Sequence, residues 1–424
     1  MKKTLLFCLF ILLTMKLFAI ELPFCGDVNY KPEVQTVLLY ADGDQLKDPI
    51  IPLDNMMGRL TLSFDILNGD GDVLNYTFIH CTHDWQPTDI QRIQYASGFE
   101  SDLIDDYAFS LNTVVDFVNY HLAFPNKDMH PLISGNYLLV VFEDDLREEN
   151  IYFTRRFMVL DERASIAAAV PRYPDDLKLT DTHQQLDVKA VMNNIQASNV
   201  QQYTHLTIRQ NGRWDNAAIG LQPTFVYPDR ISFEHHPMTV FEAGNQFRRF
   251  NTSNFYFQSE NLAHIWQTDD YYAIDISTCE SRAHKPYISY EDIHGKKVIY
   301  IEDENKDNDT EADYAMVNFF LKWDAPLPTE DVYILGAISD WTFSERNKMI
   351  YNYHLHGYEC SMLLKQGYYN FMFVTVDRNS YEVRSDITAG NFWETYNVYS
   401  LYFYYYNAVK GYDELIGYST VNSH

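Results

Sequence analysis

The chain has 424 residues, of which 46% are apolar, so it can bury a sizeable core divided among about two to four domains. Its 59 acidic and 32 basic residues give a net charge of −27, which excludes the usual binders of nucleic acid and of anionic membranes, because both need clustered Lys and Arg. The 33 Tyr and 27 Phe residues favour β-strands, since aromatic side chains fit a pleated, half-buried surface.

The first 19 residues have the pattern of a secretory signal peptide. Lys2 and Lys3 precede an apolar stretch over residues 4–14, and Ala19 offers a small residue for cleavage. This stretch is too short to span a membrane, and no later stretch approaches the roughly 18 apolar residues of a spanning helix. We therefore expect an exported soluble protein, with a net charge of about −30 after three lysines and no acid are removed.

Four cysteines lie beyond residue 19: Cys25, Cys81, Cys279 and Cys360. Their wide spacing predicts neither a zinc site nor a dense disulfide framework. Cys25 and Cys81 would fall in one domain and are the pair to test for a disulfide, but small buried thiols are the simpler interpretation. Lipidation of Cys25 is disfavoured because residues 22–24 lack the small side chains that the peptidase prefers.

A first β-sandwich is predicted over residues 20–161. Residues 60–65 alternate apolar and polar side chains, which is the period of a half-buried strand, and residues 68–72 form a turn of Asn, Asp and Gly. Short strands separated by polar turns are typical of an antiparallel sandwich. The other predicted strands of this domain are residues 34–40, 76–81, 137–142 and 154–160.

Two further sandwiches are predicted, over residues 162–313 and 314–424. The acidic stretch 302–313 suits a linker between them. The aromatic stretch 398–406 is expected to be central in its sheet, whereas an edge position would let a partner add a strand. The remaining predicted strands are residues 185–191, 205–209, 255–258, 271–276, 297–302, 316–321, 331–335, 359–364 and 369–376. The predicted fold class is all-β, with tandem immunoglobulin-like β-sandwich domains.

The densest group of reactive side chains is the segment 80–85. A nucleophile pair of His80 and Cys81 is disfavoured because neighbouring residues on a strand face opposite sides. His80, His83 and Asp84 could form a metal site, but buried structural roles are the favoured interpretation. Trp85, just past the strand, is expected to pack this loop onto the sandwich.

Acidic residues offer two weaker candidates. Asp70 and Asp72, and the stretch 302–313, could hold calcium, but neither has the spacing of an EF-hand, so solvated turns are favoured. The sequence has no hydrolase, metalloprotease or nucleotide-binding motif, and no catalytic residue, metal or cofactor is assigned. An exported glycoside hydrolase stays open as an alternative, because its two carboxylates need proximity only in space.

The last predicted domain poses a sharper question. Residues 331–341 read as a strand, a glycine and then Asp340-Trp341, and a hairpin is predicted around residues 364–371. This order is similar to early-set immunoglobulin-like modules of the glycogen-binding type, in which aromatic rings stack on sugars. Trp341 and Trp393 would then be the platform of an exported carbohydrate-binding protein; packing is the alternative role.

Several stretches, in order, resemble the plug-protein family of the Bacteroidetes type IX secretion system. They include residues 210–216, with the sequence Gln-Asn-Gly-Arg-Trp-Asp-Asn, and residues 76–81 with 84–85, 132–139, 154–159, 244–248, 280–282, 290–295, 332–341 and 412–418. The resemblance implies a non-enzymatic periplasmic protein. Such a protein would bind the giant outer-membrane β-barrel of the translocon and seal the periplasmic end of its pore while cargo uses the lateral gate.

Two expectations about the partner follow from the residues. Arg213, Trp214, Arg248, Arg249 and Phe250 belong to types enriched at interfaces and are candidate contacts with the barrel, with burial inside the second domain as the alternative. The negative charge predicts a positively charged rim on the barrel mouth and an association that is sensitive to salt.

Overall fold

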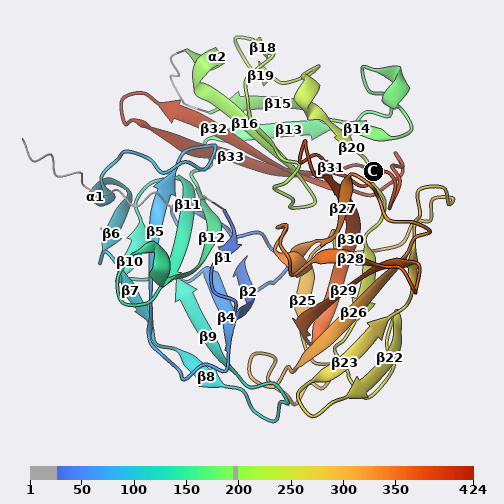
Figure 1. Ribbon diagram of the computed structural model, residues 1–424. Helices are drawn as coiled ribbons and strands as arrows, with labels where there is room; N and C mark the ends of the chain where they lie inside the picture. Colours follow the sequence, from blue (N-terminus) through green and yellow to red (C-terminus); the bar gives the residue numbers. More distant parts are fainter. Residues whose placement is uncertain (1–25, 194–198) are drawn as a thin grey trace, which may run out of the picture.

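The computed structural model describes residues 26–193 and 199–424, and these form an all-β protein of several sheets (Figure 1). The predicted signal peptide and Cys25, with its lipidation and disulfide alternatives, lie outside the described residues. Within them, no helix combines the length and the apolar character needed to cross a membrane. The predicted fold class is confirmed as all-β, while the glycogen-binding-like character of the last domain stays a prediction.

The first unit, residues 26–161, packs two sheets around one core. One sheet has the order β1-β12-β11-β5-β7, with β3 beside β12, and the other has the order β2-β4-β9-β8. Their strands are β1 (Val28–Asn29), β2 (Val34–Ala41), β3 (Ile50–Pro52), β4 (Leu60–Leu67), β5 (Leu74–Cys81), β7 (Asp102–Ile104), β8 (Tyr107–Phe109), β9 (Phe117–Phe124), β11 (Gly135–Phe142) and β12 (Ile151–Leu160). The short helix α1 (Arg92–Tyr95) and the pair β6 (Ala96–Gly98) and β10 (Met129–Pro131) lie beside them.

Strand β5 shows why the pattern predicts this unit well. Tyr76 and Phe78 lie in the core between the two sheets, whereas Ile79 and Cys81 lie in a second apolar cluster on the opposite face. His80 follows the first pair and is fully buried. The predicted alternation is confirmed, because a β-strand turns successive side chains to opposite faces.

The middle unit combines residues from two distant parts of the chain. Its sheets have the orders β13-β15-β19-β18 and β17-β16-β32-β33, with the pair β14-β20 and the helix α2 (Val200–Tyr203) beside them. The strands are β13 (Ala164–Ala169), β14 (His183–Gln185), β15 (Asp187–Met192), β16 (Thr204–Gln210), β17 (Ala218–Leu221), β18 (Phe225–Val226), β19 (Ile231–Ser232), β20 (Val240–Glu242), β32 (Val398–Asn407) and β33 (Tyr412–Asn422). The aromatic strand β32 is central, as predicted, between β16 and β33.

The third unit is one 11-stranded sheet around a separate core. Its main path is β21-β30-β27-β28-β29-β26-β23-β22, and β24, β25 and β31 pair beside it. The strands are β21 (Arg248–Asn251), β22 (Leu262–Gln267), β23 (Tyr272–Ile276), β24 (Cys279–Glu280), β25 (Lys297–Ile299), β26 (Tyr314–Lys322), β27 (Glu330–Leu335), β28 (Lys348–Asn352), β29 (Gly357–Lys365), β30 (Gly367–Asp377) and β31 (Val383–Arg384).

The strand pairing crosses the division that the sequence predicts at residue 313. Strands β21 and β25 pair with β30, and β23 pairs with β26, so residues 248–299 share a sheet with the residues that follow. The acidic stretch 302–313 is therefore a loop within the third unit. Its Asp313 is buried and accepts hydrogen bonds from the backbone N–H groups of Val114 and Val115 in the first unit.

One predicted strand is wrong. Residues 255–257 form bends, because Asn251 and Asn254 accept hydrogen bonds from the backbone N–H groups of Ser253 and Tyr256 and so favour turns. Tyr256 and Phe257 are exposed by 78% and 72% there. The aromatic composition that suggested a strand instead places two rings on the surface.

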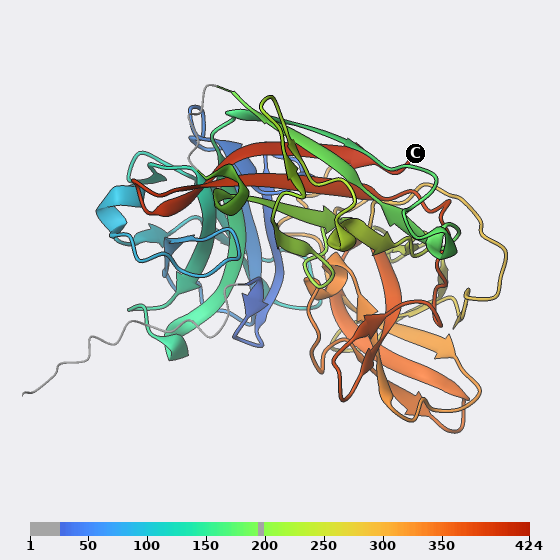
Figure 2. The same ribbon diagram turned by 90° about the horizontal axis from the view of Figure 1, so that it is seen from above.

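Figures 1 and 2 show the first and third units side by side, with the middle unit lying across both. The outer face of the first unit packs on the hairpin β32–β33, where Leu138 and Met158 share an apolar cluster with Tyr402, Tyr404 and Leu415. The first and third units meet at a buried ion pair in which Lys365 Nζ lies 2.7 Å from Asp65 Oδ2. The first unit thus contacts both other units through side chains withdrawn from water.

Candidate functional site

The loop after β5 carries the first unit onto the middle unit. Trp85 is 3% exposed, and its ring lies edge-on to Trp214 with centroids 5.3 Å apart. The guanidinium groups of Arg209 and Arg156 lie 4.1 and 4.5 Å from the centroid of Trp214. The predicted packing role of Trp85 is confirmed. Because a cation over an indole face is strongest where water is excluded, this cluster fixes the two units together.

Two of the predicted interface residues lie at this junction. Arg213 forms a 2.6 Å ion pair with Asp215, its side chain is 12% exposed, and its guanidinium lies 6.0 Å from the ring of Trp341 in the third unit. Trp214 packs on Trp85 of the first unit. Arg213 and Trp214 therefore both form contacts between units of this chain.

The other predicted interface residues lie apart from Trp214, in the third unit. Phe250 is fully buried and stacks on Tyr369 with centroids 5.2 Å apart, so it presents no surface to a partner and that part of the prediction is wrong. Arg249 forms a 2.8 Å ion pair with Glu260, and Arg248 lies 5.3 Å from the ring of Phe373. The sequence around Phe250 has no periodic pattern that would show whether a Phe next to two arginines lies in the core or on the surface.

The predicted sugar platform is occupied by the chain itself. Trp341 lies edge-on to Phe247 at 6.1 Å, next to Arg213. Trp393 lies 4.3 Å beneath the guanidinium of Arg172 and 4.5 Å from the ring of His424. Packing, the alternative role that the sequence left open, describes both rings.

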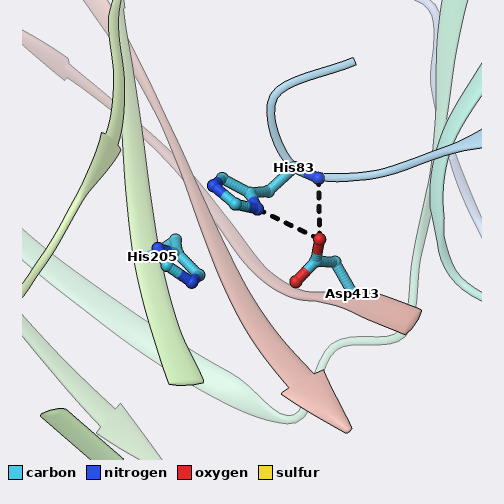
Figure 3. Close-up of side chains that lie close together, drawn as sticks. All are labelled: His83, His205 and Asp413. Atoms are coloured by element: carbon cyan, nitrogen blue, oxygen red, sulfur yellow. Dashed lines mark hydrogen bonds and ion pairs between the residues drawn. The ribbon is translucent and has the colours of Figure 1, made fainter. Parts of the chain in front are cut away.

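A cluster of His83, His205 and Asp413 joins the same two units (Figure 3). His83 follows β5, His205 lies on β16 and Asp413 lies on β33. Both Nδ1 and the backbone N–H of His83 lie 3.0 Å from Asp413 Oδ2, and the two imidazole rings are stacked with centroids 4.0 Å apart and planes 7° apart. Sequence reasoning identified only His83, because the other two residues lie more than a hundred positions away.

These three residues could together supply ligands to a metal, but their geometry favours a hydrogen-bonded stack. An imidazole nitrogen binds a metal through a lone pair in the ring plane. The two ring planes are nearly parallel, with centroids 4.0 Å apart, so their in-plane lone pairs do not point to a common position and both rings cannot bind one ion as they stand. Nδ1 of His83 is moreover engaged with Asp413.

Burial and hydrogen bonding set the charges of this cluster. Burial opposes ionisation of Asp413, but the hydrogen bonds from His83 outweigh it and hold the pKa of this carboxyl below its ordinary value. Burial, helped by the neighbouring His83 ring, lowers the pKa of His205. Burial also lowers the pKa of His80 to about 4. At neutral pH the site therefore holds the neutral ring of His205 near the ionised carboxylate of Asp413. The two hydrogen bonds from His83 to this carboxylate orient the hairpin β32–β33 on the first unit.

Comparisons with known proteins place the chain in context. Residues 34–161 match the family model described as the type 9 secretion system plug protein 1st domain. The chain is also similar to the crystal structure of a hypothetical protein from Parabacteroides merdae ATCC 43184, with 31% sequence identity and a TM-score of 0.88. That match covers 94% of this chain and 99% of the other. No curated protein matches the chain.

Proposed function

Because the chain belongs to the type IX secretion system plug protein family, we propose that it is a non-enzymatic periplasmic plug, which binds the giant outer-membrane β-barrel of the translocon and seals the periplasmic end of its pore. The match over residues 34–161 is the observation that carries the proposal. This match supports a role in type IX secretion directly. Binding to the barrel and sealing of its pore are the more specific parts of the proposal.

The physical character of the molecule supports a sealing role. A plug has to block the passage of solutes without being deformed, which requires that its structural units keep a fixed arrangement. The buried Asp65–Lys365 pair joins the first unit to the third, and the half-buried ring of Trp214 joins it to the middle unit. Such closely packed contacts hold only in one geometry. The net charge of −27 favours a reversible, electrostatically guided contact over an apolar one.

The test is an affinity purification of the tagged protein from the detergent-solubilised envelope of its own bacterium, followed by mass spectrometry. We expect a very large outer-membrane β-barrel in near-equimolar amount at low salt and less of it at high salt, because exposed charges are screened. Equal recovery at both salt concentrations would contradict the charged rim. Absence of the barrel, together with retention on a polysaccharide column, would overturn the plug proposal.

Sealing needs a second readout. Cells without the protein should admit a large antibiotic that the outer membrane normally excludes, and the wild-type chain should restore exclusion. A double variant of two exposed lysines, K285Q/K322Q, has the same backbone and is the matched control for expression level. Unchanged permeability in cells that lack the protein would contradict the seal while leaving binding to the barrel open to the first experiment.

A further inference from the structure

A cavity of about 170 Å³ lies where all three units meet. The first unit contributes Asp48 and Arg155, the middle unit contributes Arg209 and Trp214, and the third unit contributes Lys297. The lining residues come from six separate segments of the chain, so the cavity exists only when the three units are docked.

Positive charge exceeds negative charge in this cavity. Asp48 lies 3.0 Å from Lys296 Nζ and 3.8 Å from an Arg209 nitrogen. On the other side, an Asp340 oxygen lies 3.0 Å from Arg155 and the other lies 3.3 Å from Lys297 Nζ. We call these six residues the cation cluster: four cations share two carboxylates. The side chains of all six are at most 28% exposed.

The excess persists at neutral pH. Burial opposes ionisation of Asp48 and Asp340, but the neighbouring lysines and arginines hold the pKa of both carboxyls below the ordinary value. Both carboxylates are therefore ionised, and they cancel two of the four positive charges. The other charged groups at the cavity add little to the excess, because Arg156 pairs with Asp27 at 3.8 Å and Lys47 pairs with Asp42 at 3.2 Å.

Partly buried positive charge without a counter-charge is costly, and it is unexpected in a chain with 59 acids and 32 bases. We propose that the cavity is a binding site for a small oxyanion, a phosphate or carboxylate group, held by the cation cluster. The guanidinium groups of Arg155 and Arg209 suit this ligand class, because their planar N–H donors match the spacing of oxyanion oxygens.

The size of the cavity limits the ligand. Pockets that enclose drug-sized ligands have volumes of roughly 300–1,000 Å³, so 170 Å³ suits an inorganic oxyanion with a few waters better than a nucleotide. Since the ligand would contact cations from all three units, it would bind only the docked state. Binding then stabilises the docked state in proportion to the ligand concentration.

The experiment is calorimetric titration of the purified full chain with inorganic phosphate at constant ionic strength, with melting temperature as a second readout. We expect saturable binding and a melting temperature that rises with phosphate but not with chloride. In the double variant K296Q/K297Q each carboxylate keeps one arginine and the excess charge is gone. We expect its phosphate affinity to fall by about tenfold or more.

The matched control is K285Q/K322Q, which removes the same charge from lysines that are 53% and 59% exposed next to Glu280. It should bind phosphate as the wild type does. Succinate, titrated in parallel, distinguishes a carboxylate site from a phosphate site, and saturable binding of either ion that depends on Lys296 and Lys297 supports the proposal. Binding of neither ion, or equal affinity in wild type and K296Q/K297Q, would overturn it.

Discussion

The first unit is held to its two neighbours by different physics. Against the third unit, Asp65 and Lys365 form a 2.7 Å pair whose side chains are 1% and 2% exposed, and Tyr314 donates a 2.6 Å hydrogen bond to the same carboxylate. Against the middle unit, the contact consists of stacked rings and cations around Trp214. The ion pair is directional and fails completely when one partner is lost, whereas the ring cluster loses stability in proportion to the surface removed.

The largest effect is expected at the ion pair. K365M leaves the Asp65 carboxylate buried without its cation, and we expect the free energy of unfolding, measured with urea, to fall by about 3–5 kcal/mol. The double variant D65N/K365M should recover most of this loss, because no charge is then stranded. K322M, on the exposed end of β26, is the control and should change stability by less than about 0.5 kcal/mol. A K365M protein as stable as K322M would show that the pair does not hold this junction.

Acid should act on the other junction, through His80 next to Tyr412 of the hairpin. Because burial lowers the pKa of His80 to about 4, the unfolded chain takes up this proton first as the pH falls. The stability that the folded protein owes to a neutral His80 is complete above pH 6.5. It is lost as the pH falls from about 6.5 to 4, and the free energy of unfolding then decreases by about 3 kcal/mol at most. H80Q should flatten the pH dependence of unfolding in this window. The control H264Q, whose side chain is 76% exposed, should keep the wild-type slope.

A graded loss is expected at the ring cluster. W214A removes half-buried aromatic surface and the face on which Arg156 and Arg209 lie, so the free energy of unfolding should fall by about 2 kcal/mol. W214F should lose about half as much, because one ring is retained. W266A, at the 44% exposed Trp of β22, serves as the control. If W214A and W266A unfold alike, the rings do not bind the two units.

The smallest effect is expected from zinc. Because the rings of His83 and His205 are stacked, added zinc should raise the melting temperature of the wild type no more than that of H205Q. The measurement is thermal unfolding with and without zinc at pH 7. A zinc-dependent rise that disappears in H205Q would mean that the rings turn to bind the ion, and the junction would then be metal-dependent.

Local patterns predict the strands of this protein better than their partners. The alternation over residues 60–65 and 76–81 corresponds to β4 and β5, since burial on one face leaves a period of two in the sequence. The predicted division at residue 313 fails to follow the sheets, because β21 pairs with β30 across more than a hundred residues. No local pattern records which distant strand lies alongside.

The candidate site, too, could be predicted only where its residues are close together in the sequence. His83 and Trp85 stand out in one short segment, and the interpretation that Trp85 packs its loop onto the sandwich is confirmed by the apolar cluster that it shares with Leu138 and Val140. His205 and Asp413 have ordinary surroundings in the sequence and acquire a role only when β16 and β33 meet the first unit. The cation cluster is likewise scattered over five segments, so its excess charge is hidden within a strongly acidic composition.

The return of the chain to the middle unit imposes an order of events during synthesis. Strand β16 emerges about two hundred residues before β32, its hydrogen-bonded neighbour, and the whole third unit is made in between. The first unit can therefore fold early, while the middle unit has to wait with one edge of β16 unpaired until the hairpin arrives. A ribosome or an export channel that stalls before residue 398 would release a chain whose middle unit lacks the hairpin β32–β33, which quality control could recognise by the exposed edge of β16.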